Sequence, residues 1–448
     1  MKKQFDLIVI GTGTAAQGVA TRIRAAGQSV AVIDCKPYGG TCAIRGCDPK
    51  KILVGAASAI DHARRMQGKG VADTPHIDWR ELIAFKRGFT DPVPSEREKS
   101  YAKNGIAGFH GQARFTGRNS LEVEGAALEG THIVIASGAK PVRLAIPGEE
   151  HLIDNEEFLA LEALPKRIVM VGGGYIAAEF SHVAARAGAK VTVLQRGERM
   201  LDHFEPELVG WLVEKFEAVG IDVRTGTSVE AVEKAASGFR VKASSGGKAL
   251  TVEADLVVHA AGRVPAIDDL EPEAAGLALK DGRLELNQYL QSVSNSSVYA
   301  AGDAAGSGPP LTPVASHHAK VVAGNLLDGN RHEPDYRGVP SVAFTIPPIA
   351  AVGLSEAEAQ RQGLEFSAKS EKASDWYTAR HTAEPVYGFK VLVETGTERI
   401  LGAHLVGPHA DEVINLFALA IRQGLTASDL KQTMFAYPTG ASDIGYMV

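Results

Sequence analysis

The chain has 448 residues, of which 45% are hydrophobic and 22% charged, and its formal net charge is -6 at pH 7. A single hydrophobic core stops growing at roughly 250 to 300 residues, so we expect about three domains. The composition is typical of a soluble globular enzyme and excludes a disordered or fibrous chain. No basic block could neutralise a row of phosphates, and no apolar run reaches the roughly 18 residues of a spanning helix, so we expect neither nucleic-acid nor membrane binding.

The first elements in chain order are a strand and a glycine turn. The stretch "DLIVIGTGTAAQ" (6–17) joins a continuous apolar run to glycines, a pattern that predicts a buried strand feeding a helix. It lacks the long apolar segment and small-residue cleavage site of a secretion signal. The chain has only three cysteines, which argues against a disulfide-stapled secreted scaffold, and we place the protein in the cytoplasm.

The same pattern returns at "RIVMVGGGYIAAEF" (167–180). A gap-free shift of 161 residues superposes the two stretches and the apolar strands that follow them, which end at Asp34 and Gln195. The shift pairs Gly11, Gly13 and Ala16 with Gly172, Gly174 and Ala177. Glycines permit a tight turn, and a helix N-terminus offers free amides to a pyrophosphate. Two such units are stronger evidence than one, and they predict two bound dinucleotides.

The two predicted sites differ where the second strand ends. Asp34 can accept hydrogen bonds from both ribose hydroxyls of an unphosphorylated adenosine. Gln195 removes the matching carboxylate, and Arg196 and Arg199 follow it as cations that could hold a 2'-phosphate. The second site is therefore expected to favour NADPH over NADH, unless both arginines are only solvated surface charge.

Between the two units lies "GGTCAIRGCDPKK" (39–51), in which four residues separate Cys42 from Cys47. Structural zinc needs four nitrogen or sulfur ligands, and no second pair completes such a site. A static bridge is disfavoured because cytosolic thiols are kept reduced and so short a loop constrains the unfolded chain little. A redox-active pair is the preferred interpretation.

Helix geometry restricts where a disulfide between Cys42 and Cys47 can form. Residues i and i+5 of an ideal helix lie about 8 to 9 Å apart, beyond the roughly 7 Å that a disulfide can span. The helix must therefore be distorted, or the pair must straddle its start, which Gly46 would allow. Near a helix N-terminus and close to Lys50 and Lys51, at least one thiol should have a lowered pKa.

Further stretches follow in order. They are "VIASGAKP" (134–141), "AAGRVPAIDDL" (260–270), "VYAAGDAAG" (298–306), "LTPVA" (311–315) and "PSVAFTIPPIAAVGLSEAEA" (340–359). Together with the two dinucleotide units and the cysteine motif, they closely resemble the flavoprotein disulfide reductases, the family of glutathione reductase, dihydrolipoamide dehydrogenase and mercuric reductase. The resemblance covers nearly the whole chain.

The resemblance implies an α/β fold with two Rossmann-like dinucleotide-binding domains and a C-terminal α+β dimerisation domain. The expected division is an FAD-binding domain in residues 1–145, an NAD(P)-binding domain in 146–263, a return segment of the FAD domain in 264–334, and an interface domain of a homodimer in 335–448. A helix over 410–424 has apolar residues on more than one face, as expected if it packs in a core and against a partner.

The resemblance also assigns cofactor residues. FAD would contact Gly11, Gly13, Ala16, Asp34, Thr41, Lys51, Ser137, Gly138 and Asp303, and the nicotinamide cofactor Gly172, Gly174 and Ala177. Gly262, Gly302 and Thr312 belong to matching motifs and are expected at the cofactor sites. No resident metal is expected.

The implied reaction passes hydride from NADPH to FAD and then electrons to the disulfide. Cys47 would be the sulfur nearer the flavin, and Cys42 the outward thiol that meets the acceptor. Tyr175 would cover the flavin until the nicotinamide displaces it, and Glu179 would pair with Lys50.

The chain departs from the family pattern near its C-terminus. Disulfide-reducing members carry a histidine before Pro-Thr and then a glutamate, where this chain has Tyr437 and Ser442. A phenol titrates near 10 and an imidazole near 6.5, so Tyr437 is a poor acid-base group at neutral pH. We therefore expect an acceptor such as a metal ion, a quinone or an unusual disulfide. A reductase of small disulfides and a non-enzymatic flavin-bound sensor or complex subunit remain alternatives.

Five other positions carry smaller expectations. Asp48 should raise the pKa of the neighbouring thiol unless Arg45 pairs with it, and the two could instead contact substrate, relay protons or cap a helix. Cys35 is expected to be a partly buried packing residue. His317 and His318 are expected on a helix as packing or surface residues.

Overall fold

The computed structural model describes residues 2–73 and 75–448. The chain folds as two compact units, each assembled from three stretches: Met1–Lys50, Phe85–Val142 and Arg263–Tyr336 in the first, and Lys51–Ala84, Arg143–Gly262 and Arg337–Val448 in the second. The units divide the chain more coarsely than the four predicted domain segments, which stay a prediction. No helix in the described part of the chain is long and apolar enough to cross a bilayer.

The first unit is built on a seven-stranded sheet. Its strand order is β3-β2-β1-β6-β5-β4, with β18 also paired to β6, and β3, β2, β1, β6 and β18 run parallel. The second half of β1 is buried on both faces, as its unbroken apolar run predicts. The strands are β1 (Lys3–Ile10), β2 (Val30–Asp34), β3 (Ala107–His110), β4 (Arg114–Gly117), β5 (Ser120–Val123), β6 (Ala126–Ile135) and β18 (Val298–Ala300).

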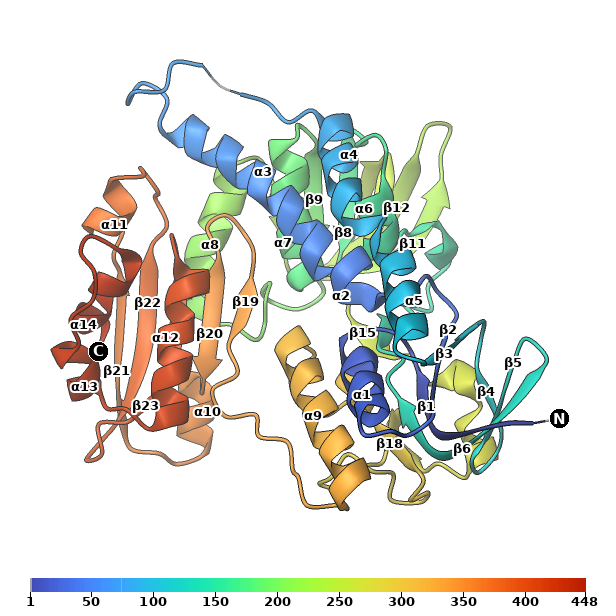
Figure 1. Ribbon diagram of the computed structural model, residues 1–448. Helices are drawn as coiled ribbons and strands as arrows, with labels where there is room; N and C mark the ends of the chain where they lie inside the picture. Colours follow the sequence, from blue (N-terminus) through green and yellow to red (C-terminus); the bar gives the residue numbers. More distant parts are fainter. Residues whose placement is uncertain (1, 74) are drawn as a thin grey trace. The chain divides into compact units, whose positions relative to one another are not determined.

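Helix α1 (Thr14–Ala25) covers this sheet with one face, because its buried residues recur at helical spacing. It runs beside α9 (Thr312–Asp328) (Figure 1). A Cβ at Gly18 would lie 2.6 Å from the Cβ of Ala319, so the two helices approach closely only with glycine there.

The first unit also contains elements outside this sheet and helix pair. They are α2 (Gly40–Arg45), the start of α3 (Cys47–Arg65), the end of α4 (Trp79–Thr90), α5 (Val93–Lys103), β7 (Ala139–Pro141) paired with β15 (Arg263–Pro265), η2 (Asp268–Leu270), η3 (Pro272–Ala275), β16 (Leu279–Lys280), β17 (Arg283–Leu284) and η4 (Gly302–Ala305).

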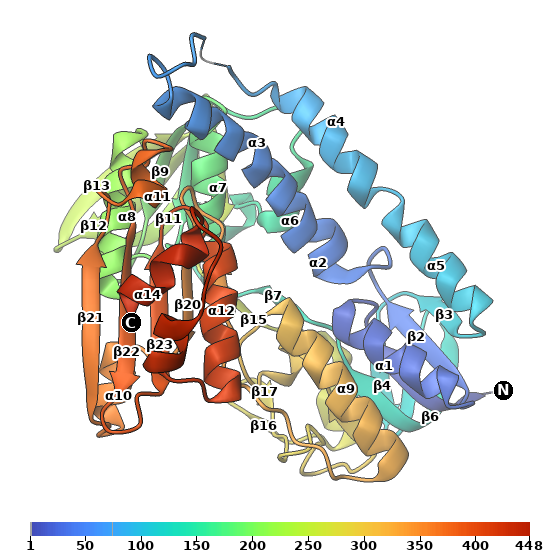
Figure 2. The same cartoon turned by 60° about the vertical axis from the view of Figure 1, so that its left-hand side comes forward.

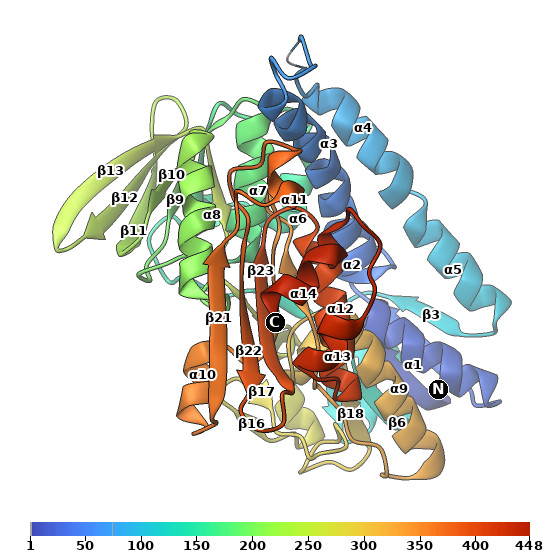
Figure 3. The ribbon, with the colours of Figure 1, turned by 90° about the vertical axis from the view of Figure 1, so that its left-hand side faces the viewer.

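The second unit repeats the strand-turn-helix pattern in a smaller parallel sheet with the order β10-β9-β8-β14. A three-stranded antiparallel sheet, β11-β12-β13, flanks it (Figure 3). The elements are η1 (Glu149–His151), α6 (Asn155–Ala160), β8 (Arg167–Val171), α7 (Tyr175–Arg186), β9 (Lys190–Leu194), α8 (Pro206–Ala218), β10 (Asp222–Arg224), β11 (Thr227–Lys234), β12 (Phe239–Ser245), β13 (Lys248–Ala254) and β14 (Leu256–His259).

The C-terminal part of the second unit is an antiparallel sheet with the order β19-β20-β23-β22-β21. Helix α12 (Ala410–Gln423) packs on β20 and β23 (Figure 2) and leaves Leu419 exposed, which agrees with the prediction of apolar residues on more than one face. The other elements are β19 (Ser341–Ala343), β20 (Ile349–Gly353), α10 (Glu356–Arg361), β21 (Phe366–Lys372), α11 (Tyr377–Arg380), β22 (Gly388–Glu394), β23 (Ile400–Val406), α13 (Ala427–Gln432), η5 (Gly440–Asp443) and α14 (Ile444–Met447).

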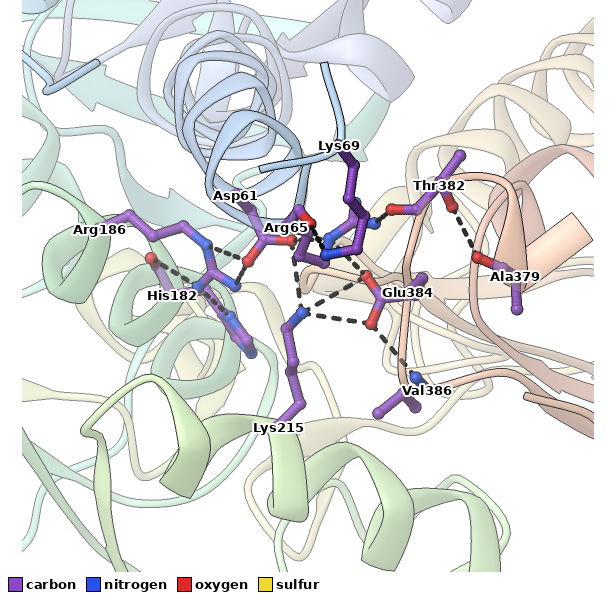
Figure 4. Close-up of polar contacts among 10 residues, drawn as sticks. All are labelled: Asp61, Arg65, Lys69, His182, Arg186, Lys215, Ala379, Thr382, Glu384 and Val386. Carbon is purple, nitrogen blue, oxygen red and sulfur yellow. Dashed lines mark hydrogen bonds and ion pairs between the residues drawn. The ribbon is translucent and has the colours of Figure 1, made fainter. Parts of the chain in front are cut away.

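A cluster of buried charges, which we call the ionic cluster, joins α3, α7, α8 and the chain before β22 within the second unit (Figure 4). Asp61 on α3 accepts hydrogen bonds from Arg186 at 2.5 Å and from Arg65 at 2.7 Å. Lys215 on α8 lies 3.4 Å from the Asp61 carboxylate and 3.2 Å from that of Glu384. Three cations thus share two carboxylates, which ties the helices of the parallel sheet to the C-terminal domain.

Candidate active site

Two glycine turns of the same construction follow the first strand of each parallel sheet. Gly11 has φ +112°, and a Cβ there would lie 2.3 Å from the carbonyl oxygen of Ala136. Gly172 has φ +109°, and its Cβ would lie 2.3 Å from the carbonyl oxygen of Ala260. Both turns therefore require glycine, for conformation and for space. The repeat seen in the sequence is a repeat of backbone structure.

Each turn leads into a helix whose N-terminus is open to an anion. Gly13 and Gly174 are the N-cap residues of α1 and α7, neither helix receives a side-chain cap in the described structure, and neither has an acidic residue in its first turn. The first amides of each helix are thus available to a phosphate group. Ala16 and Ala177 are fully buried, which allows each helix to pack closely on its sheet. Both sites fit the pyrophosphate of a dinucleotide.

The residues at the ends of the next strands are held differently. The Asp34 carboxylate accepts hydrogen bonds from the Thr12 hydroxyl at 2.6 Å and from the Lys36 amide at 2.9 Å, so it is oriented at the end of β2. Gln195 lies just after β9, and its side-chain amide donates to the carbonyl of Arg199 at 3.1 Å. Arg196 is exposed to solvent.

Arg199 is engaged by its own loop. Its guanidinium donates to the carbonyl of Asp202 at 2.8 Å and lies 3.8 Å from the Asp202 carboxylate. The positive charge of Arg199 is therefore partly balanced within the loop, whereas that of the exposed Arg196 faces water.

A cavity of about 100 Å³ lies at the second turn. Tyr175, the first residue of α7, lines it and contacts the Phe204 ring edge-on at 5.6 Å between centroids. Burial, with a smaller effect of the Glu179 charge, raises the pKa of Tyr175 to about 12. The full lining is Gly173, Gly174, Tyr175, Gln195, Leu201, Asp202, His203 and Phe204. Sequence reasoning missed Asp202 and His203, although both follow the arginine-bearing loop that it singled out.

The cysteine motif lies across a helix break. Cys42 is in α2, which ends at Arg45, and Cys47 is the first residue of α3. Gly46 separates the helices, and a Cβ on it would lie 3.0 Å from the carbonyl oxygen of Thr41. The prediction that the pair straddles a helix start, with Gly46 at the break, is confirmed.

The hydroxyl of Thr312 contacts both sulfurs. It donates to Cys42 Sγ at 3.1 Å, and Cys47 Sγ lies 3.4 Å from the same oxygen. A hydrogen bond from Cys42, a second from Thr312 and the charge of Lys50 lower the pKa of the Cys47 thiol to about 6, whereas burial and the charge of Asp48 oppose this. The pKa of Cys42 is raised, first by its hydrogen bond to Cys47 and then by burial. One thiolate beside one thiol is therefore the expected state of the reduced pair near pH 7.

The predicted partners Lys50 and Glu179 belong to different units. Within the second unit, the Glu179 carboxylate is buried and accepts a hydrogen bond from the Phe344 amide at 2.8 Å. The ammonium of Lys51 lies 3.8 Å from the Phe344 ring centroid and 3.2 Å from the Asp411 carboxylate. Lys51 is thus held by the C-terminal part of its unit.

Other predicted positions of the first unit lie beside its sheet. The Ser137 hydroxyl donates to the carbonyl of Ala266 at 2.7 Å, which joins the loop after β6 to the return segment. Burial raises the pKa of Asp303 in η4. The preceding Gly302 amide donates to Nδ1 of the buried His318 at 3.1 Å, so His318 is a packing residue, as predicted. His317, also on α9, accepts a hydrogen bond from the Asp335 amide at 2.9 Å. Thr41 lies in α2, and Gly138 has a positive φ. The predicted Gly262, which also has a positive φ, is the last residue of its stretch in the second unit.

One expectation is corrected and two are refined. Cys35 is exposed rather than partly buried, because β2 ends at Asp34 and leaves the next side chain beyond the sheet. Arg45 donates to the carbonyl of Pro37 at 3.3 Å, which holds the chain before α2. Tyr437 is 81% exposed in the second unit.

The sequence as a whole matches known families. Residues 5–319 match the model of the pyridine nucleotide-disulphide oxidoreductases, and residues 339–448 match the dimerisation domain of the same enzymes. The chain belongs to this family. Its members are flavoenzymes that use FAD and NAD(P)H, and this chain is therefore a flavoprotein disulfide oxidoreductase with the two dinucleotide-binding domains and the dimerisation domain of the class.

Similar proteins within the family have several activities. A mercuric reductase of Staphylococcus aureus is 32% identical over 98% of this chain and 81% of its own length. A glutathione reductase of Burkholderia cepacia is 32% identical over 99% of this chain and 98% of its own. A solved structure, the Cu(II) complex of the HOCl-induced flavoprotein disulfide reductase RclA from Escherichia coli, has a TM-score of 0.88 at 28% identity, covering 100% of this chain and 99% of that one. Similarity alone therefore does not select the electron acceptor.

Proposed function

We propose that this oxidoreductase takes electrons from NADPH, through FAD, to a Cys42–Cys47 disulfide and from there to a metal ion, with a quinone or an unusual disulfide as the other acceptors to test. The observation that carries the proposal is the convergence of both sulfurs on the hydroxyl of Thr312, with one of them acidic. A thiolate is the reactive form of cysteine in electron transfer and exchange.

The cofactors are assigned to the two turns. FAD would lie with its pyrophosphate at the first amides of α1 and its ribose on Asp34; when bound, it supplies a hydride acceptor that can reduce a disulfide. The nicotinamide cofactor would lie in the same manner at α7, beside Gln195 and Arg196. The remaining FAD contacts in this proposal are Gly11, Gly13, Ala16, Thr41, Lys51, Ser137, Gly138, Gly302 and Asp303, and the remaining nicotinamide contacts are Gly172, Gly174, Ala177 and Gly262.

Each residue of the site then has a role that its environment supports. Cys47 holds the thiolate, and the charge of Lys50 favours it. Cys42, whose pKa is raised, keeps its proton until it attacks the acceptor. Tyr175 is half-buried and lines the cavity at the second turn. In this proposal it covers the flavin until the nicotinamide displaces it. The pairing of Glu179 with Lys50 is what the family resemblance implies, and Glu179 itself is buried in the second unit.

The NADPH preference rests mainly on Arg196. Gln195 brings no negative charge to the ribose, and Arg196 is exposed beside it. Arg199 contributes less to this argument than the sequence suggests, because it is engaged by Asp202.

The class of electron acceptor is inferred from Tyr437, near the C-terminus. Tyr437 replaces the histidine that would protonate a departing thiolate, a function typically worth 10²- to 10⁴-fold in rate. A metal ion needs no protonated leaving group. The mercuric reductase and the Cu(II)-bound RclA are similar proteins whose names connect them with metal ions. The family's dimerisation domain supports a homodimer. We propose that this homodimer works in the cytoplasm.

The test is an acceptor panel with purified FAD-loaded dimer. Cu(II), Hg(II), a soluble quinone and glutathione disulfide are each assayed with NADPH and with NADH. We expect Cu(II) or Hg(II) to be reduced fastest, with one NADPH oxidised for every two Cu(II) reduced to Cu(I) and one proton released. Cys42→Ser and Cys47→Ser should abolish this turnover, and Cys35→Ser should not. Equal turnover in all three variants would show that the pair is not on the electron path.

A second candidate is a reductase of small disulfides. The glutathione reductase of Burkholderia cepacia, which matches this chain over 98% of its own length, favours it. Turnover of glutathione disulfide well above that of every metal ion in the same panel would select this function.

A further inference from the structure

Thr312 stands at the N-terminus of α9, the longest described helix that lies wholly within the first unit. It is the first residue of α9, and its backbone belongs to the motif that the sequence assigned to cofactor binding. Its side chain, however, points to sulfur: Oγ1 lies 3.1 Å from Cys42 Sγ and 3.4 Å from Cys47 Sγ. One hydroxyl therefore contacts both members of the pair.

Counting hydrogens shows what this hydroxyl can do. A threonine hydroxyl has one hydrogen to donate and two lone pairs to accept. When the reduced pair loses one proton, two hydrogens remain among three heteroatoms, the Cys42 thiol hydrogen and the Thr312 hydroxyl hydrogen. Both can then point at the charged sulfur. Rotation about the Cβ–Oγ1 bond of Thr312 re-aims its hydrogen if the charge passes to the other cysteine.

We propose that Thr312 is a positioning residue of the redox pair, whose hydroxyl holds the two sulfurs against each other and stabilises the single negative charge of the reduced pair on either of them. This inference rests on the proposed function, because it concerns the same two cysteines. It adds a residue that acts through the two cysteines, whose sulfurs its hydroxyl contacts.

Groups on three helices act on the charge of the sulfurs, and the Thr312 hydroxyl acts beside them. On α3, Lys50 favours the thiolate of Cys47 and Asp48 disfavours it. On α2, Cys42 supplies the neighbouring thiol. On α9, no acidic residue occurs in the first turn, so the positive end of the helix dipole adds to the effect of the hydroxyl. Hydrogen bonds to a charged group are roughly twice as strong as neutral ones, so Thr312 contributes most when a thiolate is present.

The experiment measures the ionisation of Cys47 directly. The FAD-loaded dimer is reduced anaerobically with dithiothreitol, the reductant is removed, and the rate of alkylation of Cys47 by iodoacetamide is followed from pH 5 to pH 9 by mass spectrometry. All variants are made in a Cys35→Ser background, which removes the exposed third thiol. The unsubstituted pair should titrate with a midpoint near pH 6.

Two substitutions separate the hydroxyl from the shape of the side chain. Thr312→Val keeps the branched shape without the hydroxyl and should raise the midpoint by about one to two pH units, the size expected for one hydrogen bond to a charged group. Thr312→Ser keeps the hydroxyl and should leave the midpoint within about half a unit of the parent. Thr312→Ala lacks the hydroxyl without adding bulk and should follow the valine variant, which gives a second reading if the valine variant does not fold.

Two outcomes overturn the inference: an unchanged midpoint in both variants that lack the hydroxyl, or a serine variant that shifts as far as they do. The experiment does not depend on the proposed electron path, because dithiothreitol reduces the pair without nicotinamide. Failure of NADPH to reduce the disulfide would refute the proposed function and leave this measurement valid.

Discussion

The ionic cluster makes a quantitative prediction about Asp61. Burial raises the pKa of its carboxyl, but Arg186 and Lys215 outweigh that effect and lower it, so Asp61 is charged in the folded protein. Asp61→Asn leaves three cations facing Glu384 alone. The side chains of Arg186, Lys215 and Glu384 are only 1%, 5% and 1% exposed, so water cannot replace the lost carboxylate. Breaking such a buried pair costs about 3 to 5 kcal/mol.

The assay is urea unfolding followed by tryptophan fluorescence. All three tryptophans, Trp79, Trp211 and Trp376, lie in the second unit with the cluster, so the signal reports that unit. With a urea dependence of about 2 to 3 kcal/mol per M, the loss lowers the unfolding midpoint by about 1 to 2.5 M. A double variant with Lys215→Met restores the charge balance and should lose at least about 1 kcal/mol less than the sum of the two single variants.

The matched control is on the same helix. Glu214 precedes Lys215 on α8 and pairs with Lys372 at 2.7 Å, but these side chains are 61% and 40% exposed. Glu214→Gln should change stability by no more than about 0.5 kcal/mol. If Asp61→Asn changes the midpoint no more than Glu214→Gln does, the cluster does not hold the second unit together as described.

Three further predictions concern pH, nucleotide and acceptor. Burial lowers the pKa of His182 and His404, and that of His318 to about 4, so below pH 6.5 the unfolded chain binds protons that the native chain does not. The free energy of unfolding should therefore fall below pH 6.5 by up to about 1.4 kcal/mol per pH unit for each histidine. Equal urea midpoints at pH 7.5 and 5.5 would contradict this. Arg196→Ala should lower kcat/KM for NADPH by roughly tenfold and leave that for NADH unchanged, because one charge-assisted contact to the 2'-phosphate is lost; an equal fall for both would refute the assignment. Tyr437→His should speed the reduction of small disulfides by supplying an acid near neutral pH, and slower turnover than the parent would refute the role given to this position.

The glycine turns could be predicted from the sequence because their cause is local. Each depends on a short run of residues in which only glycine meets the required backbone angle and spacing, as Gly11 and Gly172 do. The break at Gly46 was likewise accessible, because a disulfide between residues five apart cannot form on an ideal helix. In both cases, covalent geometry alone restricts the structure.

The ionic cluster and the role of Thr312 could not be predicted in this way. Asp61, Arg186 and Glu384 come from three separate stretches of the chain, and charged residues are normally exposed, so nothing in the sequence marks them as buried. Thr312 was found through its motif, but its contact with the sulfurs arises only when α9 packs beside the cysteine motif. The engagement of Arg199 by Asp202 was also missed, since it depends on how one loop folds back on itself.

The duplicated glycine turns have a practical consequence. Because Gly11 and Gly172 lie in different compact units, an alanine at either one obstructs a single turn and leaves its copy untouched. Under the proposed assignment of FAD to the first turn and NADPH to the second, a change of one methyl group would disable one nucleotide site alone. A mixed dimer carrying one lesion in each protomer would then reveal whether electrons can enter through one chain and leave through the other.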